Sequence, residues 1–208
     1  AVLAGLAAGL RRGIADLDGE GEVVGGIVIM RYGENALTTI RGVKRKLDEL
    51  RLGLPEGVRP VDDFELDRYL GTWYEIARLD HRFERGLSRV TADYSRRDDG
   101  GIDVLNRGYD AAKGEWKEAK GRAYPLERGN NGSLKVSFFR PFYAGYHIMA
   151  LDHDAYRYAL VCGPSRDYLW ILARTPDLES DIVAQLTAQA KAAGFATDDL
   201  IDVDHPPQ

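Results

Sequence analysis

The strongest potential nucleophile in the sequence is Cys162, which lies in the stretch VCGP. A cysteine attacks a substrate as a thiolate, and it needs a neighbouring base or cation to form one. No histidine or basic residue can be placed beside Cys162 from the sequence, so we expect a small buried side chain there. Cys162 is also the only cysteine, which excludes an internal disulfide.

Paired carboxylates and histidines offer no catalytic or metal-binding pattern either. Asp98–Asp99 and Asp198–Asp199 are adjacent residues in expected turns, where such pairs are usually solvated. The histidines are scattered along the chain without a metal-ligand spacing; they are His81, His147, His153 and His205. We therefore expect a binding protein that is not an enzyme and has neither a metal nor a cofactor.

Composition narrows the class of partner. An apolar content of 44% and a charged content of 29% are ordinary for a globular protein. The net charge of −5 and the lack of a basic run with interleaved aromatic residues argue against nucleic acid. Arg11 and Arg12 follow the apolar stretch AVLAGLAAGL instead of preceding it. We thus expect neither a signal peptide nor a lipid-anchor cysteine in the chain.

The sequence changes character near residues 55–61. Before this point, GEVVGGIVIMRYG (21–33) predicts a strand, and ALTTIRGVKRKLDELRLGL (36–54) predicts a helix with one apolar face. We assign residues 1–60 to an N-terminal strand–helix segment and residues 61–208 to a second domain.

The second domain has eight short β-type runs separated by turn signals such as DDGG (98–101), AAKG (111–114) and GNNG (129–132). A helix follows from Asp177 or Ser180 to Gly194, and residues 200–203 could add a last strand. The expected fold is all-β, an eight-stranded up-and-down antiparallel barrel with a C-terminal helix. The runs are 72–79, 89–95, 102–109, 115–124, 133–139, 145–151, 156–162 and 168–174.

Three stretches of the sequence resemble the lipocalin family. They are YLGTWYEIARLDHRFERG (69–86), SLKVSFFRPFYAGYHIMALD (133–152) and YALVCGPSRDYLWILARTP (158–176). The resemblance is to the bacterial outer-membrane type related to apolipoprotein D, and it covers about residues 64–204. It implies that Trp73 plugs the closed end of the barrel and that Arg174 lies over its ring, both as structural residues. Gly71 would let the chain turn tightly into the strand.

Strand alternation, anchored on Trp73 and Arg174 facing inward, predicts the barrel interior. Ala119, Gly121, Ala123 and Ala150 are among the residues that we expect to face inward. We expect small residues to leave room for a ligand, namely Gly108, Ala119, Gly121, Ala123 and Ala92. His147 should then point outward as a surface histidine. The predicted ligand-binding residues are Ala77, Leu79, Val90, Ala92, Tyr94, Val104, Asn106, Gly108, Val136, Phe138, Tyr146, Ile148, Trp170 and Leu172.

At the open end, the loop HRFERG (81–86) carries Arg82 and Arg85 beside Phe83. It could be a lid with cations for a carboxylate or phosphate head, or a solvated turn, and the sequence favours neither. The resemblance implies storage or transport of a small hydrophobic ligand, a fatty acid or lysophospholipid, in the bacterial envelope.

The stretch 11–58 is similar to part of the periplasmic porter region of heavy-metal efflux pumps of the resistance–nodulation–division type. It suggests an alternative, a non-enzymatic interaction module in which this segment docks a partner or mediates oligomerisation. Peripheral membrane contact and a homodimer are further partner hypotheses.

Overall fold

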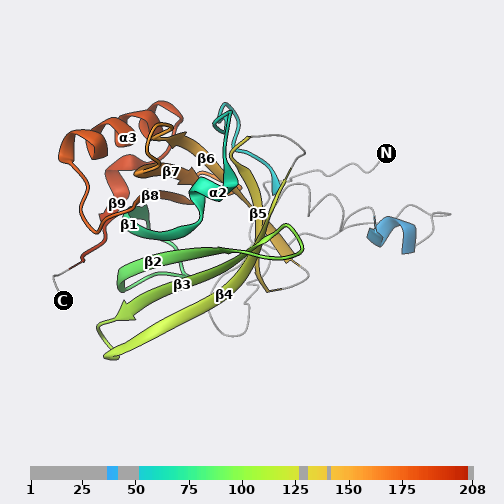
Figure 1. Cartoon of the computed structure of the whole chain (residues 1–208), viewed down its shortest axis with the longest axis horizontal. Coiled ribbons are helices and arrows are strands. Elements are labelled where there is room, and N and C mark those ends of the chain that lie inside the picture. Colours follow the sequence, from blue (N-terminus) through green and yellow to red (C-terminus); the bar gives the residue numbers. More distant parts are fainter. Residues whose placement is uncertain (1–36, 42–51, 127–130, 140–141, 206–208) are drawn as a thin grey trace, which may run out of the picture. The chain divides into compact units, whose positions relative to one another are not determined.

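The computed structural model describes residues 37–41, 52–126, 131–139 and 142–205 (Figure 1). The chain divides into two units, residues 1–45 and 46–208. Within the first unit, residues 37–41 are helical, as expected for the run 36–54. The expected strand at 21–33 lies outside the described residues, and the domain boundary after residue 60 stays a prediction.

The second unit is a closed antiparallel barrel in which each strand pairs with the next and β1 closes the ring by pairing with β2 and β8. The prediction of eight barrel strands is confirmed. A ninth strand, β9 (Leu200–Asp202), pairs with the end of β1. The barrel strands are β1 (Gly71–Leu79), β2 (Leu87–Arg96), β3 (Ile102–Asp110), β4 (Glu115–Pro125), β5 (Ser133–Phe139), β6 (Phe142–Leu151), β7 (Tyr158–Cys162) and β8 (Leu169–Ala173).

Two short helical elements lie outside the barrel sequence of hairpins. The four-residue helix α2 (Leu66–Tyr69) directly precedes β1 and was not anticipated from the sequence. A 3-10 turn, η1 (Thr197–Asp199), leads into β9. Because β1 starts beside α2, the loops after β1, β3, β5 and β7 all lie at the opposite, open end of the barrel.

The C-terminal helix α3 (Ser180–Ala192) packs on the outside of the barrel wall, beside β7 and β8 in Figure 1. Its apolar residues Leu186 and Ala190 are fully buried in one cluster with Leu160 and Ile171. Gly194 follows with φ +84°, a conformation that ends helices and favours glycine. No helix in the described part of the chain is long and apolar enough to cross a membrane.

The barrel residues belong to two cores, an inner core inside the barrel and an outer core between the barrel wall and α3. β-bulges decide to which of the two cores some residues belong. In the β1–β8 ladder, Glu75 pairs with Leu172 but Ala77 pairs with Ile171, so one extra residue is inserted on β1. The bulge reverses the alternation of side chains after Glu75. Ala77 and Leu79 therefore face outward under α3, and the expectation that they face the interior is wrong.

A second bulge lies on β6, between Ile148 and Ala150. Ile148 pairs with Val161 and faces the interior, whereas Ala150 pairs with Leu160 and faces the helix-covered outside. The inward expectation for Ala150 is wrong for the same reason as for Ala77.

Candidate ligand site

The floor of the barrel is built around Trp73, which is fully buried. Its indole Nε1 donates a hydrogen bond to the carbonyl of Tyr69, 2.8 Å away. The guanidinium of Arg174 lies 4.0 Å from the indole centroid and donates to the carbonyls of Arg68 and Thr72. Cation–π stacking and these hydrogen bonds seal this end of the barrel, as expected.

Gly71 has the backbone conformation that the tight entry to β1 requires. Its φ is +95°, and a Cβ at this position would lie 3.4 Å from Nη1 of Arg174. A side chain here would be strained whatever the space. The glycine therefore places Trp73 and allows Arg174 to cover it.

Three tyrosines extend the floor into the lumen. The hydroxyl oxygens of Tyr69 and Tyr146 are 2.7 Å apart, and the hydroxyl of Tyr94 donates to that of Tyr146 at 3.1 Å. Burial raises the pKa of Tyr94 to about 12, so these hydroxyls stay neutral. They give the floor a small polar surface among apolar rings.

The walls above the floor are apolar and come from every part of the ring. Most predicted interior residues do face the lumen. They either belong to the buried apolar cluster inside the barrel or pair with a member of that cluster on the neighbouring strand. On β3, the side-chain amide oxygen Oδ1 of Asn106 is buried without a hydrogen-bond partner in the described structure. The predicted residues in the inner cluster are Ala92, Tyr94, Val104, Val136, Tyr146, Ile148, Trp170 and Leu172.

The lumen is least filled along β3 and β4. Asn106 pairs with Ala119 and Val104 with Gly121, so small side chains face inward on β4. Gly108 lies against Leu87 and Val90. Phe138 stays 36% exposed beside a bulge on β5, and its ring packs against Gly121.

A buried polar cluster lines the lumen wall between the floor and the open end, and sequence reasoning missed it. Beyond the β1 bulge, Arg78 pairs in register with Trp170 and so faces inward. Nη1 of Arg78 donates to Glu75 at 2.7 Å. From the loop after β1, Glu84 accepts a hydrogen bond from Trp170 Nε1 at 3.1 Å and lies 3.0 Å from His81 Nε2.

The two carboxyl groups of this cluster titrate differently. Burial and the neighbouring charge of Glu84 raise the pKa of Glu75 well above its ordinary value, against the opposing effect of Arg78. Burial also acts on Glu84, but hydrogen bonding to His81 and Trp170 lowers its pKa overall. The pair is coupled by a hydrogen bond between the carboxyl groups, so a proton is held more readily by Glu75 than by Glu84.

The mouth loop therefore has two faces. His81 and Glu84 point into the barrel, whereas Phe83 is 59% exposed. Arg82 stacks on Phe83 at 4.8 Å, and Arg85 forms an ion pair with Asp80 at 2.8 Å. The expected lid cations Arg82 and Arg85 lie on the solvent side of the loop, and the charges that face the lumen come from other residues.

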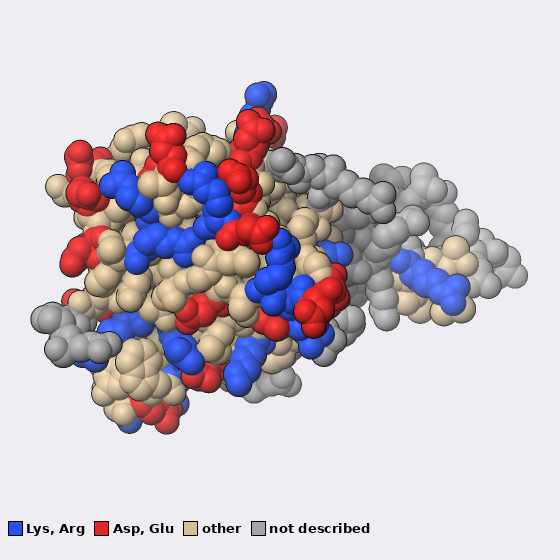
Figure 2. Space-filling model, in the orientation of Figure 1, with Lys and Arg blue, Asp and Glu red and all other residues tan. Residues whose placement is uncertain are grey.

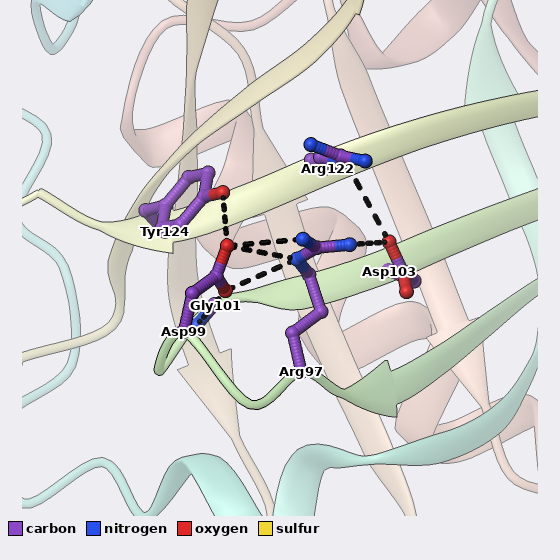
Figure 3. Close-up of polar contacts among 6 residues, drawn as sticks. All are labelled: Arg97, Asp99, Gly101, Asp103, Arg122 and Tyr124. Carbon is purple, nitrogen blue, oxygen red and sulfur yellow. Dashed lines mark hydrogen bonds and ion pairs between the residues drawn. The ribbon is translucent and has the colours of Figure 1, made fainter.

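A hollow of about 630 Å³ lies on the outer face of β2 to β5, with Asp93, Asp103, Lys120 and Arg122 in its lining. Its carboxylate Asp103 is already paired (Figure 3): Arg97 bonds both Asp99 and Asp103, and Arg122 lies 3.8 Å from Asp103. On the face drawn in Figure 2, basic and acidic side chains are interspersed. This surface is a solvated ion-pair network.

Two other candidates are structural. Cys162 is buried in the cluster under α3, and burial raises the pKa of its thiol to about 12. His147 faces outward as expected, but it is fully buried, so the expectation of a surface histidine is wrong. Its ring nitrogens lie 3.0 Å from the hydroxyl of Ser133 and 3.1 Å from the carbonyl of Gly53, because the segment before the barrel covers it.

A barrel sealed at one end, with an apolar wall and a buried polar cluster, defines a small-molecule-binding protein of the calyx type. A family model for the lipocalin-like domain matches residues 64–205. Outer membrane lipoprotein Blc of Vibrio cholerae is 58% identical over 152 residues, which cover 73% of this chain and 89% of the relative. The protein of the same name from Escherichia coli K12 is 54% identical, covering 73% and 85%.

Among solved structures, insecticyanin from Manduca sexta aligns with a TM-score of 0.60 at 19% identity, over 74% of this chain and 87% of its own. At this identity the likeness concerns the fold alone. The chain belongs to the lipocalin family. The resemblance of residues 11–58 to an efflux pump stays a prediction, since the family model starts at residue 64.

Proposed function

We propose that this lipocalin carries one small amphiphile, a fatty acid or a lysophospholipid, in its barrel, and that it does so in the bacterial envelope. The observation that carries the proposal is a lumen sealed at one end by Trp73 and Arg174 and lined with small residues toward the other. Such a lumen suits a single acyl chain, since each buried methylene contributes about 0.8 kcal/mol.

The envelope assignment follows the relatives, which are named outer membrane lipoproteins. Lipocalins typically bind ligands and do not catalyse, and the inert surroundings of Cys162 agree with this. No contact among the described residues favours the alternative of an interaction module. A homodimer and peripheral membrane contact are further hypotheses for the same protein.

Native mass spectrometry of the full chain purified from bacteria tests the proposal. We expect one co-purified lipid per barrel, or uptake of one added oleate or lysophospholipid. The same spectra report whether the chain is a monomer or a dimer. A protein that is folded, free of lipid and unable to take up either ligand would contradict the proposal.

A matched pair of variants places the ligand. Ala119→Trp fills an inward position on β4, whereas Lys120→Trp adds the same ring to the outward neighbour. We expect the first to lose most bound lipid and the second to keep it. Equal binding by both variants would mean that the lipid sits outside the barrel.

A further inference from the structure

Arg78 and His81 each carry one buried nitrogen that has no partner within the described residues. Arg78 is 2% exposed and His81 is 6% exposed. Nε of Arg78 and Nδ1 of His81 have no partner among the described residues, whereas Nε2 of His81 lies 3.0 Å from the Glu84 carboxylate. The remaining nitrogens of Arg78 are occupied by Glu75 and by the carbonyls of Glu84 and Leu87. A guanidinium Nε–H is always a donor, and a buried one without an acceptor is unfavourable.

These donors lie in the lumen that the proposed function fills. Register with β8 turns Arg78 inward beside Trp170. The rings of Phe83, Tyr168 and Trp170 surround His81 at centroid distances of 6.1, 5.7 and 5.2 Å. An amphiphile whose chain points to the floor would therefore bring its head to this level of the barrel.

The charged groups around these nitrogens limit which kind of ligand head group can bind there. The buried carboxyl of Glu75 on β1 is paired with the Arg78 guanidinium, and the carboxylate of Glu84 on the mouth loop lies beside His81 and Trp170. The other facing groups are His81, the indole of Trp170 and, from β2, the neutral phenol of Tyr94. A ligand carboxylate would be a third carboxyl group in this buried space, where uncompensated charge is expensive.

We propose that Arg78 Nε and His81 hold an uncharged oxygen of the ligand head, an ester carbonyl or a hydroxyl, and that a free carboxylate enters only together with a proton. The inference rests on the proposed function and refines its ligand class. Monoacyl esters, whether monoacylglycerols or lysophospholipids, supply such an oxygen directly. A fatty acid supplies it only when the acid or Glu75 carries a proton.

Titration calorimetry on the full chain between about pH 6 and pH 9 tests this with three ligands of equal chain length. Monolaurin, which is uncharged, should bind with the same affinity throughout. Laurate should weaken as pH rises, by up to about tenfold per pH unit where one proton must be taken up. Dodecanesulfonate, which stays charged at every pH, should bind more weakly than the other two ligands and should weaken further as Glu75 loses its proton.

Glu75→Gln removes the titratable charge of residue 75 and keeps a side chain of nearly the same shape, so it tests the effect of the charge alone. Glutamine keeps the contacts with Arg78 and Glu84 and carries a permanent N–H in place of the Glu75 proton. We expect laurate to bind this variant at least about tenfold more tightly at pH 9, with a flattened pH dependence, and monolaurin to bind unchanged. Glu118→Gln, the same change on the exposed outer face, should behave as the unaltered protein.

His81→Phe removes one set of donors while a ring still fits among the aromatic neighbours. We expect it to weaken monolaurin about tenfold, the effect of one lost hydrogen bond. The proposal would be overturned by laurate and monolaurin binding alike at every pH, or by a Glu75→Gln variant with an unchanged laurate profile. Lipid binding itself would survive that result, whereas failure of all three ligands to bind would overturn the proposed function.

Discussion

The two ends of the lumen both depend on an inward-facing arginine, and the surroundings of the two arginines differ. Arg174 at the floor stacks on Trp73 and donates to three backbone carbonyls, including that of Tyr156. Arg78 near the mouth pairs with Glu75, donates to the carbonyls of Glu84 and Leu87, and leaves Nε without a partner among the described residues. The first arrangement is complete without a ligand, which is typical of a structural site, and the second is not.

The contrast follows the β1 strand and its bulge. Residues 71–74 pair with β2 and close the barrel around the floor. After the bulge at Glu75, residues 77–79 pair with β9 on the same side. The bulge therefore exchanges apolar for charged side chains in the lumen, because it turns Ala77 and Leu79 outward and Arg78 inward.

The largest effect should come from the floor. Trp73→Ala removes a fully buried indole and should lower the free energy of unfolding by about 3–5 kcal/mol. Trp116→Ala removes an indole that is 54% exposed and should cost far less. Denaturant unfolding measures both. Similar losses in the two variants would break the view of the floor as the main structural site.

A smaller effect should come from the wall between the barrel and α3. Leu79→Ala should lower the free energy of unfolding by about 2–4 kcal/mol, since Leu79 is buried in the outer core. Affinity for monolaurin should stay unchanged in the folded variant, measured by calorimetry. A large change in affinity with little loss of stability would mean that the Leu79 side chain faces the lumen, which would contradict the outward direction that the bulge gives it.

The smallest effect should be on the pH dependence of stability, to which Glu75 near the mouth and Asp99 in the loop after β2 contribute with opposite sign. The folded-state pKa of Glu75 is raised, so its contribution to stability is full at low pH and is lost as pH rises through that value. Hydrogen bonds from Arg97 lower the pKa of the exposed Asp99 to about 2. Its contribution is present above its unfolded pKa of about 4 and is lost as pH falls toward 2.

Thermal unfolding across pH separates these contributions. Glu75→Gln should remove part of the alkaline decrease in melting temperature and leave the acidic side unchanged. Asp99→Asn should reduce the acidic decrease slightly and leave the alkaline side unchanged. An alkaline profile that Glu75→Gln does not alter would mean that Glu75 is ionised in the folded protein.

The sequence was sufficient for the parts of the molecule that depend on local pattern. Alternation and turn residues predicted each barrel strand to within a few residues, because a half-buried strand leaves a period of two and hairpins need turn residues. The floor residues Gly71, Trp73 and Arg174 were expected from the resemblance to lipocalins. Most inner positions from β2 to β5 followed from alternation alone.

The buried cluster could not be predicted in the same way. A bulge adds one residue without a distinct sequence signal, and it reverses every inward assignment that follows. Charged residues such as Glu75 and Arg78 are most often exposed, so their types pointed outward. His81 and Glu84 were part of a loop whose role the sequence left open.

By itself the sequence determined a lipocalin barrel and the residues that seal its floor, because those depend on periodicity and on a few distinctive side chains. Only the tertiary structure decided what faces a ligand near the mouth. Burial in the lumen is set by strand register and by the path of the loop after β1. Two carboxylates and an arginine become neighbours there because a bulge turns β1 and the loop folds back over it.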